Sequence, residues 1–172
     1  MRDLGWLAAA LLVGGCGGAA VEKGNASAAN ETSANELAAG SEGWDLVSSG
    51  EGVALVLGSA DAPLVRLYCP AASGEILVNV PDSDPSGSEE RMSFGSGGEV
   101  VALVADTRGD ADRGGVTGTG PVPGNLAALV GGPVAVNYGA QNSGPHPAPP
   151  AQLAQAFVAA CGETSGESGG SG

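Results

Sequence analysis

Glycine and proline are spread along the chain, and they constrain its fold more than any other feature. The sequence holds 31 glycines and 11 prolines among 172 residues. These are the two least favourable residues in a helix interior, so they argue against a helical bundle and predict frequent turns. Aromatic residues make up only 3% of the chain, so the core must be built mainly from Ala, Val and Leu. Such a core has little volume to spare and would benefit from covalent support.

Six short apolar runs separated by Gly, Pro, Asp and Ser predict β-strands. They span residues 53–57, 64–69, 75–80, 90–94, 99–105 and 134–138, and a further short strand is expected at 116–119. Leu64, Arg66 and Tyr68 alternate with Val65, Leu67 and Cys69, which is the period of a strand with one buried face. Trp44 opens this region.

Two helices are expected in the second half of the chain. Residues 125–130 follow Pro121 and Pro123 and end at Gly131, the usual order of breakers around a short helix. Residues 149–161 begin with prolines, end before Gly162 and place Leu153, Phe157 and Cys161 on one helix face. We therefore expect a mainly β fold, either a β-sandwich or an open barrel, with a short helix and a C-terminal helix packed on it.

The N-terminus resembles a bacterial lipoprotein signal. Residues 4–13 are apolar apart from Gly5, and this run is too short for a bilayer span, which needs about 20 residues. Val13-Gly14-Gly15-Cys16 resembles the lipobox, in which the cysteine thiol takes a diacylglycerol and the new N-terminus takes an acyl group such as palmitate. The resemblance implies a signal peptide at 1–15 and lipidation of Cys16. The alternative is an ordinary secretory signal with an incidental cysteine.

Cys16 sets the expected location of the rest of the chain. Gly17 follows it in place of the Asp that retains lipoproteins in the inner membrane, so we expect an outer-membrane anchor with the domain facing the periplasm. Residues 16–42 are rich in Ala, Gly, Ser, Asn and Glu and predict a disordered tether. The folded domain should span 43–161, and the Gly/Ser/Glu-rich residues 162–172 predict a disordered tail.

The net charge limits the possible partners. The chain carries −13 at neutral pH, and removal of residues 1–15 leaves that value unchanged because Arg2 and Asp3 are lost together. Such a surface is repelled by phosphate backbones, so nucleic acid is excluded as a partner. Contact with anionic membranes should come only through the lipid on Cys16.

Cys69 and Cys161 are the two cysteines left after lipidation. Both lie on runs that should face the core, and an oxidising compartment predicts a disulfide between them. The alternative is a pair of buried free thiols. A disulfide would remove both from any metal site, and we expect no cofactor.

The evidence for catalysis is weak. His146 is the sole histidine and lies between Pro145 and Pro147, so it could act as a general base or metal ligand, or be an exposed loop residue. Asp106, Asp110 and Asp112 share a Gly-rich turn that could hold Ca²⁺, but the terminal bidentate Glu of the known loop pattern is missing. We assign no catalytic and no metal-binding residue.

Residues 44–161 resemble an uncharacterised short lipoprotein family of Gram-negative bacteria. The resemblance rests on residues 91–99, 139–147 and 156–161, and it implies compartment and fold without an activity. A looser similarity links Trp44, Cys69, Phe157 and Cys161 to small periplasmic proteins associated with type VI secretion. The Phe-Asp-Leu type of helix start is absent here, and residues 139–150 are extra, so this similarity implies fold alone.

The sequence thus favours a lipid-anchored envelope protein whose domain is a non-enzymatic binding or structural module with an unknown envelope partner. One alternative is a periplasmic hydrolase using His146. Another is an inhibitor of an envelope-degrading enzyme such as lysozyme, because small acidic lipoproteins can cap basic enzymes.

Overall fold

A computed structural model describes residues 43–59 and 61–166. They form one antiparallel sheet of nine strands in the order β1-β2-β3-β4-β7-β6-β5-β8-β9, together with two helices. The strands are β1 (Trp44–Ser49), β2 (Gly52–Gly58), β3 (Pro63–Pro70), β4 (Glu75–Val80), β5 (Arg91–Ser96), β6 (Glu99–Ala105), β7 (Val116–Pro121), β8 (Val134–Tyr138) and β9 (Gln141–His146). The helices are α1 (Leu126–Val130) and α2 (Ala151–Gly166). The predicted mainly β fold with both helices packed on it is confirmed, and the sheet is a single open one.

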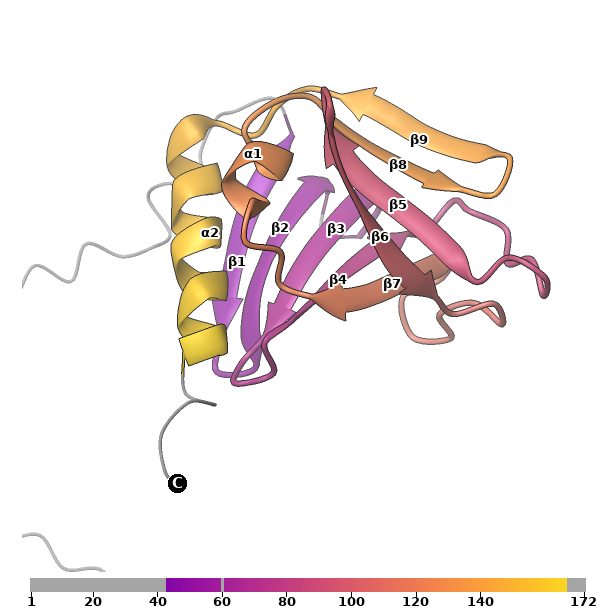
Figure 1. Ribbon diagram of the computed structural model, residues 1–172, viewed down its shortest axis with the longest axis horizontal. Helices are drawn as coiled ribbons and strands as arrows, with labels where there is room; N and C mark the ends of the chain where they lie inside the picture. The colour runs from indigo at the N-terminus through magenta and orange to yellow at the C-terminus, as the bar shows by residue number, and fades with distance from the viewer. Residues whose placement is uncertain (1–42, 60, 167–172) are drawn as a thin grey trace, which may run out of the picture. The chain divides into compact units, whose positions relative to one another are not determined.

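The sheet curls around the two helices, so that β1–β4 run at a steep angle to β5, β8 and β9 (Figure 1). The two halves of the sheet meet where β6 pairs with β7, through Val104 opposite Thr119 and Ala105 opposite Gly118. Gly118 permits this junction, because a Cβ there would lie 2.8 Å from Met92 Sδ and 3.0 Å from Leu103 Cβ. Real Cβ atoms do not approach other heavy atoms so closely without displacement.

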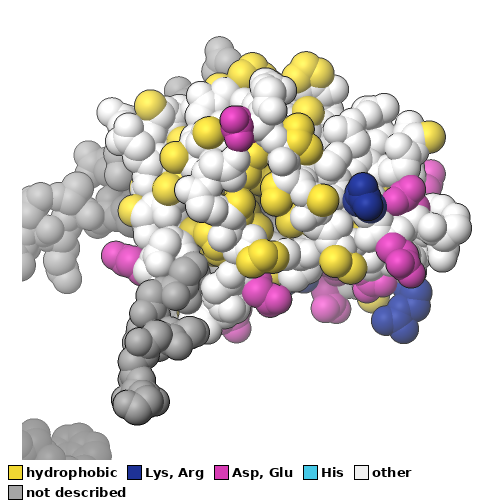
Figure 2. Space-filling model, viewed as in Figure 1, with side chains coloured by type: hydrophobic (Ala, Val, Ile, Leu, Met, Phe, Trp, Pro, Cys, Tyr) yellow, Lys and Arg dark blue, Asp and Glu magenta, His cyan; other side chains and the backbone are white. Residues whose placement is uncertain are grey.

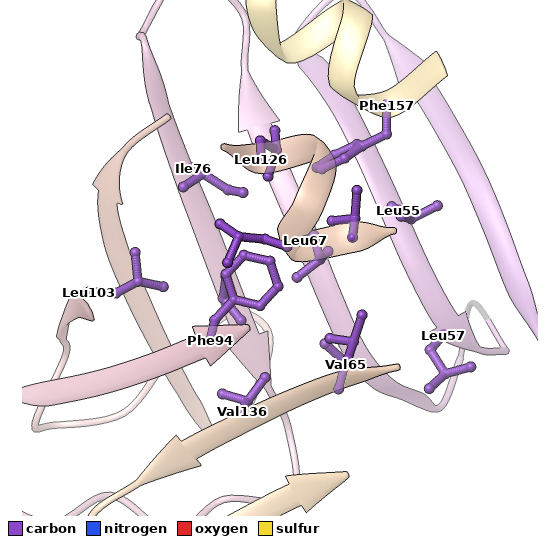
Figure 3. Packing of buried hydrophobic residues seen from close by; sticks show 14 of the residues in the cluster. Leu55, Leu57, Val65, Leu67, Ile76, Phe94, Leu103, Leu126, Val136 and Phe157 are labelled. Carbon is purple, nitrogen blue, oxygen red and sulfur yellow. The ribbon is translucent and has the colours of Figure 1, made fainter. Parts of the chain in front are cut away.

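The core lies between the concave face of the sheet and the helices. Phe94 of β5 and Phe157 of α2 are fully buried, and they point into a space lined by aliphatic side chains (Figure 3). On β2 and β3 the inward positions are paired by the strand register, as Leu55 with Leu67 and Leu57 with Val65. These residues follow the alternation seen in the sequence, which is why the strands of this half were predictable.

The edges of the sheet differ from the sequence expectations. β9 (Gln141–His146) was not among the expected strands, and His146, between Pro145 and Pro147, was considered as a loop residue. It pairs only with β8. Pro has no backbone N–H to donate, and an edge strand tolerates this because one side of its backbone forms no hydrogen bonds with another strand. At the other edge, Trp44 of β1 is buried and its Nε1 donates a hydrogen bond of 2.8 Å to Pro147 O, beyond the end of β9.

Helix α2 continues to Gly166, whereas the sequence predicted its end before Gly162. Glycine inside a helix costs only about 1 kcal/mol relative to Ala, so a single Gly need not end a helix that packs on a sheet. The predicted signal peptide at 1–15, the tether at 16–42 and residues 167–172 of the tail lie outside the described residues.

Candidate functional site

The two core cysteines form the predicted disulfide. Cys69 of β3 and Cys161 of α2 are fully buried, with an S–S distance of 2.09 Å and a Cα–Cα distance of 5.5 Å. The alternative of two free thiols is therefore wrong for this structure. The bond holds the C-terminal helix against the concave face of the sheet. Cys16, the predicted lipidation site, lies outside the described residues.

The three aspartates considered for a cation line a common hollow of about 500 Å³ together with Arg108 and Thr117. Asp106 Oδ1 accepts a hydrogen bond from the Arg108 backbone N–H, and Asp110 Oδ1 accepts from the backbone N–H groups of Asp112 and Arg113. The turn thus uses two of its carboxylates to hold its own backbone. Within residues 43–59 and 61–166, no group of three or more His, Cys, Asp or Glu side chains is placed to hold a metal ion.

Asp110 fixes this turn to the sheet. Its Oδ2 accepts a hydrogen bond of 2.6 Å from Thr117 Oγ1 on β7, and its side chain is only 10% exposed. Burial alone would raise the pKa of Asp110. The hydrogen bonds from Thr117, Arg113 and Asp112 and the Arg113 charge outweigh burial, so the pKa lies below its usual value. Asp110 is therefore a structural carboxylate, ionised at neutral pH.

Asn79 of β4 belongs to the same hydrogen-bond network as Asp110 and Thr117. Its Nδ2 donates to Gly114 O and to Thr117 Oγ1, each at 3.0 Å. Gly114 O can only accept, and the Thr117 hydroxyl already donates to Asp110, so both bonds require the amide nitrogen here. This fixes the orientation of the Asn79 amide. Its Oδ1 has no hydrogen-bond partner in the protein, although Asn79 is only 2% exposed.

A small polar hollow lies where Asn79 meets Arg66. The two residues are opposite each other on β4 and β3, and Arg66 Nε is also buried without a partner. The hollow, here called the Arg66–Asn79 pocket, measures about 190 Å³ and is lined by Asp61, Pro63, Arg66, Asn79, Asp112 and Arg113. An unpaired acceptor and an unpaired donor thus lie on neighbouring strands of one pocket. Such groups cost about 1 to 3 kcal/mol each when buried unpaired, so each calls for a structural or functional reason.

A second hollow adjoins this pocket on the face of the sheet opposite the helices. It measures about 230 Å³ and shares Arg66 and Arg113 with the first. Its other walls are mainly apolar, and they are Val47, Ala54, Val56 and Tyr68, with Ser49 and Glu51 at the end. We call it the outer-face hollow. Together the two hollows offer a charged end and an apolar end.

The sequence did not single out Arg66, Asn79 or Asp61. Arg66 occupied an outward position of an alternating strand, where a charged residue needs no explanation. Asn79 carried a readable signal, because it interrupts the buried run from Ile76 to Val80 and Asn is disfavoured in strand interiors. Asp112, which was considered together with Asp106 and Asp110 for a cation, also lies in the wall of the Arg66–Asn79 pocket.

His146 lies on edge strand β9 and contacts one hydroxyl. Its Nε2 is 2.8 Å from Ser143 Oγ, and burial lowers the pKa of His146. Neither residue lines the two hollows on the outer face or those beside the helices. In the part of the chain that the structure describes, no carboxylate forms an ion pair or hydrogen bond with His146. The pair therefore lacks the third member of a catalytic triad.

The helices carry an apolar surface of their own. Small side chains of α1 and α2, among them Ala127, Val130, Ala154 and Val158, line a hollow of about 440 Å³. Figure 2 shows hydrophobic side chains gathered on the side of the molecule where these helices lie. Among the residues described, no helix has the length and apolar character needed to cross a bilayer.

The Arg66–Asn79 pocket is distinguished by two residues whose buried polar atoms have no hydrogen-bond partner. We choose it as the candidate site on this geometry alone. Comparisons with protein-family models, with curated protein sequences and with solved structures find no significant match.

Proposed function

We propose that this protein is a lipid-anchored envelope protein that acts as a non-enzymatic binding module, with the Arg66–Asn79 pocket as its ligand site. The anchor is Cys16 in the Val13-Gly14-Gly15-Cys16 sequence, in the outer membrane with the domain facing the periplasm. The buried Cys69–Cys161 disulfide supports export, because disulfides persist in the periplasm and are rare in the cytosol.

The binding role rests on one observation: Asn79 Oδ1 and Arg66 Nε are both unpaired, and their residues lie opposite each other on neighbouring strands. A ligand with one donor and one acceptor would satisfy both atoms. The hydrogen bonds of Asn79 favour a binding role over a purely structural one. Its Nδ2 atom already joins the turn to β4 and β7, so its Oδ1 atom is not needed to hold the turn.

The anchor is tested by the intact mass of the chain expressed in a Gram-negative host. We expect a mature protein that begins at Cys16 with a diacylglycerol and an N-acyl group, and that partitions with outer membranes. Cys16→Ser should yield a chain without acyl groups. A wild-type chain cleaved elsewhere, or cleaved without acylation, contradicts the anchor and leaves the binding role to its own test.

The binding role is tested by a ligand screen on the full Cys16→Ser chain, followed by thermal unfolding. The probes are an amine, a carboxylate, an α-amino acid, a dipeptide and a monosaccharide, each at millimolar concentration. We expect at least one to raise the unfolding temperature of the chain but not that of Arg66→Met. The control is Arg91→Met, which alters an exposed arginine of β5 that does not line the pocket. If no probe stabilises the chain, the binding role is refuted.

A hydrolase using His146 is the second candidate, favoured by the Ser143 Oγ–His146 Nε2 contact of 2.8 Å. A neutral imidazole beside a hydroxyl is the first step of nucleophile activation. Labelling with a fluorophosphonate, lost in Ser143→Ala and in His146→Gln, is the result expected of an enzyme. The absence of labelling in the wild type excludes it.

A further inference from the structure

We propose that the Arg66–Asn79 pocket binds a zwitterion, namely the ammonium and carboxylate groups of an α-amino acid or short peptide with an apolar side chain. This inference rests on the proposed binding role and specifies the ligand class. It starts from the charges around the pocket, which are of both signs: Asp61 and Asp112 are acidic, and Arg66 and Arg113 are basic.

These opposite charges line one small hollow without closing on each other. In residues 43–59 and 61–166, the ion pairs are Arg108–Asp106 and Arg113–Asp110, and neither Asp61, Asp112 nor Arg66 takes part in one. Two carboxylates and a guanidinium thus line about 190 Å³ without ion pairs to one another, and this set of charges suits a ligand that carries both signs.

The two unpaired atoms give the ligand its orientation. Arg66 Nε is a donor attached to a cation, so it should bind the ligand carboxylate. Asn79 Oδ1 is an acceptor, so it should bind an N–H of the ligand ammonium, whose charge Asp61 and Asp112 would balance. This orientation of the ligand follows from the fixed amide of Asn79, whose Nδ2 donates to Gly114 and Thr117 and so leaves Oδ1 for the ammonium. A single anion would meet two carboxylates, and a metal cation would meet two guanidinium groups.

The outer-face hollow supplies a place for the side chain. Val47, Ala54 and Val56 line it, and it meets the pocket at Arg66 and Arg113. Its volume of about 230 Å³ accommodates a branched aliphatic side chain or a second residue of a peptide. We therefore choose leucine as the first probe, because it has both charges and a branched apolar group.

The test deletes one charged group of the ligand at a time. Calorimetric titrations of the full Cys16→Ser chain would use L-leucine, 4-methylpentanoate and 3-methylbutylamine. The second lacks the ammonium and the third lacks the carboxylate, and both are smaller than leucine, so steric exclusion cannot explain a loss. We expect each to bind at least about tenfold more weakly than leucine, the effect of one charge-assisted hydrogen bond.

Matched variants assign each loss to one side of the pocket. In Arg66→Met, the advantage of leucine over 3-methylbutylamine should shrink, because the carboxylate loses its Nε partner and only Arg113 remains. In Asp61→Asn/Asp112→Asn, the advantage of leucine over 4-methylpentanoate should shrink, because the ammonium loses both balancing charges and keeps only Asn79 Oδ1. Both changes leave the Asn79–Thr117–Asp110 network intact, so the variants should fold, as far-ultraviolet circular dichroism would verify. Arg91→Met should retain the wild-type discrimination.

The outcomes separate this inference from the proposed function. Leucylglycine or glycylleucine binding more tightly than leucine assigns the site to peptides, and the reverse assigns it to free amino acids; both support the zwitterion. If 4-methylpentanoate or 3-methylbutylamine binds as well as leucine, the zwitterion is refuted and the binding role stands. If none of these probes binds, the zwitterion is refuted, and the binding role fails with it only if the monosaccharide of the wider screen also leaves the unfolding temperature unchanged.

Discussion

Reduction of the Cys69–Cys161 disulfide should lower the stability of the domain more than any single surface substitution. The bond joins residues 92 apart in sequence and therefore closes most of the domain into one covalent loop. The chain-entropy model for a loop of that length gives about 4.5 kcal/mol at 25 °C, which is an upper value. Both sulfurs are fully buried, and reduction keeps the same side chains in the core, so little packing is lost.

The assay is urea unfolding of the Cys16→Ser chain with and without a phosphine reductant, followed by tryptophan fluorescence. The substitution keeps a third thiol out of exchange. For a denaturant dependence of about 1 to 3 kcal/mol per molar urea, the midpoint should fall by about 1.5 to 4.5 M. The control is Cys69→Ala/Cys161→Ala, whose midpoint should not respond to reductant. Equal midpoints for oxidised and reduced wild type would show that the unfolded chain gains no freedom on reduction, which refutes the reasoning.

Three further changes test the packing and the polar network. Asp110→Asn should cost about 1 to 3 kcal/mol at pH 7 in urea unfolding. Folding lowers the pKa of Asp110 below its ordinary value of 3.8. The stability difference between Asp110→Asn and the wild type should therefore persist at pH values above 3.8 and shrink as the pH falls below 3.8. A difference that does not change with pH would contradict the structural role of the Asp110 carboxylate. Tyr138→Phe, which removes a buried hydroxyl that donates to Ser86 O and accepts from Ser86 N, should cost about 1 to 3 kcal/mol. Tyr68→Phe, which removes an exposed bond to Glu51 O, should cost under about 0.5 kcal/mol, and equal losses would oppose this reading. Phe157→Ala should cost about 3 to 5 kcal/mol by calorimetry, against about 0.5 kcal/mol or less for the exposed Val104→Ala.

The strands of the central sheet were predictable because their side chains alternate or are uniformly apolar. β4, β6 and β8 have the bounds expected from the sequence, and β2, β3, β5 and β7 differ by one or two residues at their ends. The edge strand β9 was not predictable, because its polar, Pro-containing sequence is stabilised by pairing with β8 rather than by burial.

The disulfide was predictable from compartment and burial, whereas the candidate pocket was not. Its walls come from the turn before β3, from β3 and β4, and from the turn before β7, and no local spacing links these segments. The unpaired state of Asn79 Oδ1 depends on which amide atom meets Gly114 and Thr117, which only coordinates reveal. The structural role of Asp110 was not predictable for the same reason, because a carboxylate that binds its own backbone looks like a free ligand in sequence.

The disulfide also governs how the domain would respond to a pull on the chain that precedes it. Tension applied through Gly43 reaches β1 first and then β2 and β3, but it stops at Cys69, because the sulfur bridge passes the load directly to Cys161. At about 3.5 Å per residue, the extensible segment from Trp44 to Cys69 lengthens by no more than about 90 Å. For a load applied between Gly43 and the residues that follow Cys161, the strands from β4 to β9 then carry no load, so one covalent bond shields two-thirds of the strands of the sheet mechanically.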